Sequence, residues 1–291
     1  MQEKRQGIMR VLRDYWNNCD LRKKGFNWAS GITSFGFTVL PESVFYFNAF
    51  ALNLPSKKII LVNRIMIAIL VYVLTSVVIM LWMYYRRKIV ISGRNYRIKI
   101  EYGDIFKMKK CKKVIAFDES FMIKVGDRPE DIYPTSICGK FLQTCSDFNE
   151  DVLQKCIQDA KLSPLTTPSN FNKTHYKPGS IAPYNEYLLL AFVPLNEDGI
   201  GVMPYEQYLA CLSFLWKEID KYHAGEDVCI PILGSGSATH IGDRRLMKQD
   251  LLDVIIASYK LSADKLQTPC TLHIVCKPDD DFSLNQIGKF I

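Results

Sequence analysis

The sequence predicts an α/β domain of three layers, with helices on both sides of a mixed sheet, preceded by an N-terminal hairpin of two transmembrane helices. Three observations lead to this prediction. Residues 65–85 form a run of 21 residues without a charge. From about residue 89, short apolar runs alternate with amphipathic helical patterns. Lysine and arginine gather on both sides of the apolar region. The predicted parts are a basic N-terminal cytosolic segment (1–25), the hairpin (26–88) and a cytosolic domain (89–291).

The first apolar segment, about residues 26–50, predicts the first span of the hairpin. It is largely apolar and aromatic, and its small residues Gly31 and Gly36 let helices approach closely. Pro41 and Glu42 interrupt it, and we expect Glu42 near the far interface. An amphipathic or re-entrant segment that lies on the bilayer is the alternative. A secretory signal peptide fits poorly, because the preceding residues are polar and no small-residue cleavage site follows.

The second apolar segment, residues 65–85, predicts a complete span. About 20 apolar residues cross a hydrocarbon core of roughly 30 Å as a helix, and a buried soluble helix of that length would show a polar face. Trp82, Tyr84 and Tyr85 gather at one end, as in an interfacial aromatic belt, and Arg86 follows directly.

The distribution of charge predicts the orientation of the hairpin. Residues 1–27 and 86–113 together hold eighteen Lys and Arg, whereas residues 55–64 hold three. Basic flanks stay on the cytosolic side, so both termini are expected in the cytoplasm and the protein is expected to be a multi-pass protein of the inner membrane. From residue 114 onward the acids outnumber the basic residues by 24 to 16. A nucleic-acid-binding domain should be basic where it binds, so no nucleic-acid partner is expected.

The cytosolic part alternates strands and helices. Apolar runs that predict buried strands lie at 96–101, 114–117, 188–193, 228–233 and 272–276. Helical periodicity covers 205–222 and 246–261, with a shorter third helix at 151–161. Residues 162–187 are rich in proline and predict a long surface loop with one short strand at most.

Cysteine and histidine usage predicts neither a disulfide framework nor a metal site. The nine cysteines are odd in number and include no Cys-x-x-Cys pair. Several of them stand in apolar runs, so we expect reduced, buried thiols. The four histidines have no ligand spacing with cysteine or aspartate.

A glycine loop follows the predicted strand at 228–233. Gly234-Ser235-Gly236-Ser237 comes directly after it, and a helix begins a few residues later. Glycine at the end of a strand lets backbone N–H groups turn toward an anion, and ligands of α/β sheets lie at this end of the strands. The loop is therefore a candidate diphosphate cradle, with a plain tight turn as the alternative. It matches neither the dinucleotide fingerprint nor a Walker loop.

Two further turns, taken with the glycine loop, carry a family resemblance. A strand that ends at Tyr102 runs into Gly103-Asp104-Ile105, and the strand at 114–117 runs into Asp118-Glu119. In this order, with the late Pro-Ile-Leu-Gly-Ser-Gly loop, these motifs resemble a macro domain, the ADP-ribose-binding fold. The expected fold is therefore a macro-like three-layer domain.

The resemblance implies which residues contact the ligand. Asp104 would contact the adenine amino group, and Ile105 would pack nearby. The segment 136–140 would stand in for the first loop, with Gly139 as its close-approach glycine. The late loop would hold the diphosphate and the distal ribose. The residues carried over from these two loops are Ser136, Gly139, Lys140, Gly234, Ser235, Gly236 and Ser237.

Asp118 departs from the family pattern, which has asparagine at this place. An aspartate there, or Glu119, could still accept hydrogen bonds from ribose hydroxyls. An acid that caps the turn after the strand is the alternative. Macro hydrolases usually need that asparagine or nearby polar groups, so the departure puts hydrolysis in doubt but not binding. His240 is the candidate for a contact with the variable end of the ligand, with an exposed loop histidine as the alternative.

The whole arrangement resembles a narrower family, the membrane-macro effectors of type II Thoeris antiphage systems. The stretches that carry this resemblance are 114–121, 136–141, 177–182 and 230–237. It implies a sensor-effector and no enzyme, with no catalytic residue, metal or cofactor. A TIR-domain partner would make an ADP-ribose conjugate, histidine-ADP-ribose in this family. The macro domain would bind it, the chains would assemble as a homo-oligomer, and the lipid bilayer would be disrupted.

Two other functions remain open on the sequence. A membrane-tethered ADP-ribose hydrolase would share the fold and the ligand, but no Ser/His/Asp or Cys/His pairing is evident from spacing. A purely structural membrane protein would leave the Gly-Asp-Ile and Gly-Ser-Gly loops as ordinary turns.

Overall fold

The computed structural model describes residues 2–47, 55–126, 128, 131–166, 173–236, 239–242, 246–277 and 282–287. The chain divides into two compact units, Met1–Arg86 and Arg87–Ile291. Each unit is considered by itself below.

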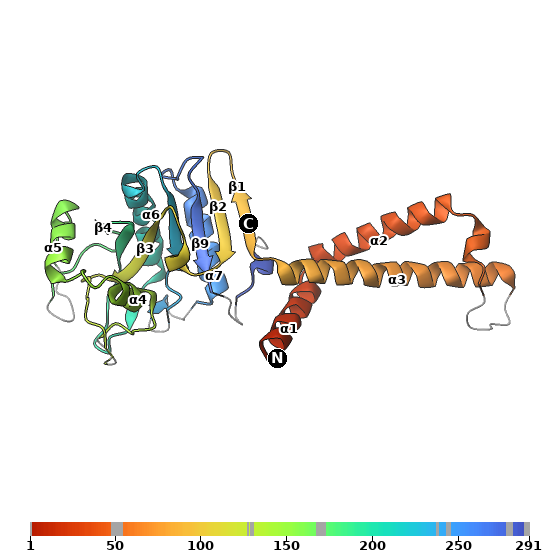
Figure 1. Cartoon of the computed structure of the whole chain (residues 1–291), viewed down its shortest axis with the longest axis horizontal. Coiled ribbons are helices and arrows are strands. Elements are labelled where there is room, and N and C mark those ends of the chain that lie inside the picture. The colour runs from red at the N-terminus through yellow and green to blue at the C-terminus, as the bar shows by residue number, and fades with distance from the viewer. Residues whose placement is uncertain are drawn as a thin grey trace. The chain divides into compact units, whose positions relative to one another are not determined.

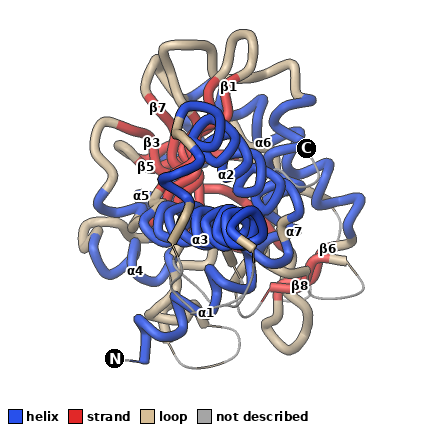
Figure 2. The backbone as a smooth tube through the Cα atoms, turned by 90° about the vertical axis from the view of Figure 1, so that its right-hand side faces the viewer, coloured by secondary structure: helices blue, strands red, loops and turns tan. Residues whose placement is uncertain are grey.

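The N-terminal unit is helical. It contains helices α1 (Gln2–Asn17), α2 (Cys19–Val39) and α3 (Ser56–Tyr85), with a short 3-10 helix, η1 (Glu42–Phe45), between the last two. Asn18 separates α1 from α2, because its side-chain Oδ1 accepts hydrogen bonds from the backbone N–H groups of Asp20 and Leu21 and so caps α2. Helices α2 and α3 pack side by side (Figures 1 and 2).

Helix α3 is the one helix in the described part of the chain that is long and apolar enough to cross a membrane. The predicted first span behaves differently, because its helix ends at Val39 and does not continue to residue 50. Pro41 explains the stop, since the residue before a proline is driven to an extended conformation, as Leu40 is. The charge-free part of α2, residues 25–39, is about 22 Å long at 1.5 Å per residue, shorter than the hydrocarbon core. Residues 48–50 of the predicted span lie outside the described residues.

Polar contacts hold the turn after α2 against the beginning of α3. The Asn63 Nδ2 group donates hydrogen bonds to the carbonyl oxygens of Phe45 and Phe47, at 2.8 Å and 2.7 Å. Arg64 lies 3.8 Å from the carboxylate of Glu42 and stacks over the ring of Phe45. Glu42 therefore lies beside the residue that precedes the charge-free run of α3.

The C-terminal unit is built on a seven-stranded mixed sheet with strand order β1-β2-β9-β7-β3-β5-β4. The five central strands run parallel, and the edge strands β1 and β4 run antiparallel to their neighbours. The strands are β1 (Lys88–Ser92), β2 (Arg97–Tyr102), β3 (Cys111–Asp118), β4 (Ile181–Tyr184), β5 (Tyr187–Val193), β7 (Asp227–Pro231) and β9 (Leu272–Cys276). A separate parallel pair joins β6 (Gly201–Met203) to β8 (Thr239–Ile241).

Helices cover both faces of the sheet and complete the three predicted layers (Figure 1). Helices α6 (Tyr205–Tyr222) and α7 (Lys248–Leu261) pack on one face, in a core that includes Ile100, Leu190 and Ile230. Helices α4 (Ile137–Thr144) and α5 (Glu150–Asp159) pack on the other face, over Phe117 and Leu189. Strands β5, β7 and β9 are buried on both faces, which explains why they appear in the sequence as continuous apolar runs. The predicted three-layer α/β fold is confirmed.

Candidate ligand-binding site

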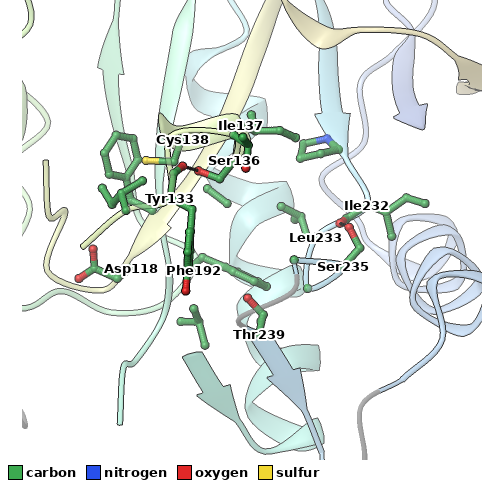
Figure 3. A pocket seen from close by; sticks show the side chains of 18 of the residues that line it. Asp118, Tyr133, Ser136, Ile137, Cys138, Phe192, Ile232, Leu233, Ser235 and Thr239 are labelled. Atoms are coloured by element: carbon green, nitrogen blue, oxygen red, sulfur yellow. Dashed lines mark hydrogen bonds between the residues drawn. The ribbon is translucent and has the colours of Figure 1, made fainter. Parts of the chain in front are cut away.

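The sheet has a cavity at the edge where its parallel strands end. Strands β2, β9, β7, β3 and β5 are parallel, so their carboxyl ends meet at one edge, the usual place for a ligand in such sheets. A cavity of about 500 Å³ lies there. Residues of the 133–138 segment and of the 231–236 loop face each other across it, with Phe192 between them (Figure 3).

The loop after β7 is a tight turn at the border of the cavity. Gly234 has φ of +84°, and a Cβ at this position would lie 3.0 Å from the side chain of Ile241, so only glycine fits without strain. The Ser235 hydroxyl donates to the carbonyl of Ile232 at 2.6 Å, and the Tyr208 hydroxyl donates to the carbonyl of Leu233 at 3.0 Å. A third bond, from the Ser235 N–H to the carbonyl of Ile232 at 3.2 Å, also holds the loop in place. Gly234, Ser235 and Gly236 all line it.

Gly236 differs from Gly234 in what a side chain would meet there. An added Cβ would approach the hydroxyl of Thr239 at 3.3 Å and would come near no backbone atom. A side chain at residue 236 would therefore fit the loop. Ser237, the remaining predicted residue of this loop, lies outside the described residues.

Two lysines at the cavity were not found from the sequence. Lys248 is the first residue of α7, and Lys277 follows the end of β9, and both line the cavity. Their positive charges would complement a diphosphate near the loop. Only the folded sheet brings residues 248 and 277 to residue 234, so no local motif could reveal them.

Asp118 ends β3 and lines the cavity. Its two carboxylate oxygens accept hydrogen bonds from the backbone N–H groups of Ser120, at 2.7 Å, and Met122, at 2.8 Å. Burial raises the pKa of this carboxyl, and the two backbone bonds oppose that rise. Asp118 thus caps the turn after the strand, which is one of the two roles weighed from the sequence. Glu119, whose pKa burial also raises, is not among the residues that line the cavity.

The segment 136–140, expected as a loop, is the beginning of helix α4. Ser136 is its N-cap, because its hydroxyl oxygen accepts a hydrogen bond from the N–H of Gly139 at 2.9 Å. An added Cβ at Gly139 would lie 2.2 Å from the carbonyl oxygen of Tyr133. At Gly139 it is therefore the protein backbone, and not the cavity, that approaches closely. Ser136 lines the cavity, whereas Gly139 and Lys140 are not among its lining residues.

Asp104 and Ile105 lie at the same edge of the sheet but outside the cavity lining. The Asp104 carboxylate accepts a hydrogen bond from the N–H of Phe106 at 3.1 Å and caps a short 3-10 turn. Ile105 is buried in a small cluster with Cys229 and Val275. The preceding Gly103 donates to the carbonyl of Cys276, a lining residue, at 2.9 Å. His240 is exposed on β8 and does not line the cavity either.

One reactive side chain that lines the cavity is the thiol of Cys138. Burial and the nearby charge of Asp118 raise the pKa of the Cys138 thiol well above its ordinary value, which keeps it protonated and unreactive. Within the described residues, no three His, Cys, Asp or Glu side chains form a group that could hold a metal ion. The cavity is thus lined by apolar side chains, the glycine loop, two lysines and the carboxylates of Asp118 and Asp131.

Comparison with known proteins identifies the family. Residues 98–277, more than half of the chain, match the model of the macro domain of Thoeris protein ThsA. The chain is also 26% identical to Thoeris protein ThsA from Bacillus amyloliquefaciens (strain Y2) over 274 residues, which cover 91% of this chain and 89% of that protein. The resemblance drawn from the short motifs is thus confirmed, and the chain belongs to the Thoeris ThsA macro-domain family.

Proposed function

We propose that this protein is a membrane-bound effector of bacterial antiphage defence whose macro domain binds an ADP-ribose-derived signal. Histidine-ADP-ribose, made by a TIR-domain partner enzyme, is the expected form of the signal. Binding triggers self-assembly of the chain, and the assembled N-terminal helices disrupt the membrane.

The cavity at the sheet edge carries the ligand part of this proposal. Its volume of about 500 Å³ falls within the range of small-molecule sites, roughly 300–1,000 Å³. The 234–236 loop and the lysines at 248 and 277 suit a diphosphate, and the apolar walls suit a base or sugar. Asp118 has a free lone pair on each oxygen and can accept a hydrogen bond from a ribose hydroxyl.

The N-terminal unit supports the membrane part. Helix α3 has the length and composition of a span, and Trp82, Tyr84 and Tyr85 stand at its cytosolic end as an aromatic belt. We propose that α2, η1 and α3 form the transmembrane hairpin, with both termini in the cytoplasm at the inner membrane. A ligand can drive assembly only through its different affinities for the free and assembled chains, so the assembled state must bind the signal more tightly.

Calorimetric titration of the full-length protein in detergent tests the binding step. We expect tight binding of histidine-ADP-ribose and weaker binding of ADP-ribose. Gly236→Glu should reduce affinity at least tenfold, because its side chain fits the loop and places a negative charge where the diphosphate would lie. Gln143→Glu is the matched control, since it adds the same charge on the exposed surface of α4.

The same samples distinguish the effector from an enzyme. Mass spectrometry after the titration should find the ligand intact. Release of free ADP-ribose from the conjugate would support the membrane-tethered hydrolase instead. If neither ligand binds the unmodified protein, the proposed signal is wrong and the cavity serves another molecule.

A further inference from the structure

Helix α1 presents an apolar arc that the rest of its own unit leaves uncovered. Ile8, Met9 and Trp16 are 53%, 63% and 62% exposed. At 3.6 residues per turn, Trp16 projects between Ile8 and Met9, so the three side chains cover an arc of about 100°. Arg10 and Arg13 follow on the next part of the helix surface. The helix is therefore amphipathic, with one apolar side larger than its packing contacts require.

The adjoining part of α1 packs on the C-terminal turns of α3. Val11, Tyr15 and Met83 form a buried cluster with Ile79 and Met80 at its border. The Tyr15 hydroxyl donates a hydrogen bond to the hydroxyl of Ser76 at 2.9 Å.

The contact extends to the last turn of α3, where Gly7 lies close to the ring of Tyr84. A Cβ added at Gly7 would be 3.2 Å from that ring. Figure 1 shows α1 lying across this end of α3.

The contact places α1 at the depth of the aromatic belt. Trp82 and Tyr85 are exposed on the same turns of α3, and the Arg86 guanidinium stacks over the Trp82 ring at 4.8 Å. Aromatic rings followed by arginine mark the boundary between hydrocarbon and headgroups. A helix held against these turns lies at that boundary, with its exposed arc beside the acyl chains.

The charge of this region complements an anionic surface. Residues 1–24 hold seven Lys and Arg against three acids, and Lys23 and Lys24 are exposed where α2 begins. Amphipathic helices with an apolar arc and basic neighbours bind in the plane of the interface, and anionic lipids strengthen that binding.

We propose that α1 is an interfacial membrane helix that inserts Ile8, Met9 and Trp16 among the lipids and recruits anionic phospholipid headgroups through the adjacent basic residues. The occupant of the arc is the lipid surface. This inference rests on the proposed membrane position of α3.

The insertion of α1 can be tested by quenching of tryptophan fluorescence in the full-length protein, reconstituted in nanodiscs. The chain has four tryptophans, so the emission lost on Trp16→Phe reports Trp16, and the emission lost on Trp82→Phe reports the belt of α3. Both substitutions keep an aromatic ring. Lipids brominated on the acyl chains should quench most of the Trp16 emission, whereas aqueous iodide should quench little of it.

Brominated phosphatidylglycerol should quench Trp16 more strongly than brominated phosphatidylcholine at the same mole fraction. The double substitution Lys23→Gln and Lys24→Gln should remove most of that excess, and equal quenching by the two lipids would refute the headgroup preference. If lipid bromine reaches Trp82 but not Trp16, α1 is covered by protein or exposed to water and this inference fails. If it reaches neither tryptophan, the membrane position itself is wrong.

Discussion

Two glycines show what the local sequence can predict about a single residue and what it cannot. Gly234 follows an apolar strand directly, where a glycine indicates a tight turn, and its positive φ shows that the structure requires glycine there. Gly139 gave the same signal for a different reason, since its missing side chain makes room for the carbonyl of Tyr133. The sequence marks that a glycine is needed, whereas only tertiary contacts decide what approaches it.

Asp253 on α7 should limit the stability of the macro domain at neutral pH. Burial, reinforced by the charge of Asp250, raises its pKa from 3.8 to about 6. Its folded pKa lies above its unfolded pKa, so ionisation favours the unfolded chain as the pH rises from about 4 to above 6. Asp253→Asn should therefore raise the free energy of unfolding at pH 7.5, by about 1 kcal/mol after screening by solvent.

Urea denaturation at pH 7.5 and pH 4.5 measures this effect. The gain in the free energy of unfolding should be smaller at pH 4.5, because Asp253 of the unsubstituted protein is then already protonated in the folded state. Asp147→Asn removes the same charge from an exposed position and serves as the control. An equal gain at both pH values would show that the titration of Asp253 is not the cause.

Helices and strands can be predicted reliably where their sequence pattern is long, and poorly where it is short. Strand β5 is buried along its full length, and α6 repeats its apolar residues over 18 positions, so both are evident in the sequence. Helix α4 has only eight residues with a glycine inside, too short a pattern to indicate a helix, and the family resemblance predicts a loop for its first part, residues 136–140. Strand β1 was missed because its residues follow a run of basic side chains.

Strand β1 should be required for a stable isolated macro domain. It pairs with β2 along its whole length, and Ile89 and Ile91 pack against the main core. A domain that begins at residue 93 loses both side chains and exposes the edge of β2. It should unfold at a lower urea concentration than one that begins at residue 87, with a loss of about 2 kcal/mol or more. Equal urea midpoints and slopes would show that β1 adds nothing.

At the scale of the whole molecule, the distribution of charge predicts more than any single motif. The basic residues of 1–27 and 86–113 bracket the apolar helices, whereas the chain from residue 114 onward is acidic. This asymmetry predicts orientation. It does not fix the number of spans, because the helix of the first apolar segment ends at Val39 and Pro41 changes the direction of the chain. The order of the short motifs identified the family, since each motif alone is compatible with an ordinary turn.

Cysteine labelling of spheroplasts should settle the topology of the hairpin. Ser56 is the exposed first residue of α3, and Cys19 is exposed at the start of α2. If α2 and α3 both cross, a membrane-impermeant maleimide should modify the Ser56→Cys protein from outside, and Cys19 should react only after permeabilisation. The unmodified protein and Cys19→Ser provide the background. Protection of both positions would mean that α2 does not cross and that the N-terminal residues through 56 stay on one side. Labelling of Cys19 from outside would contradict the orientation that the basic flanks predict.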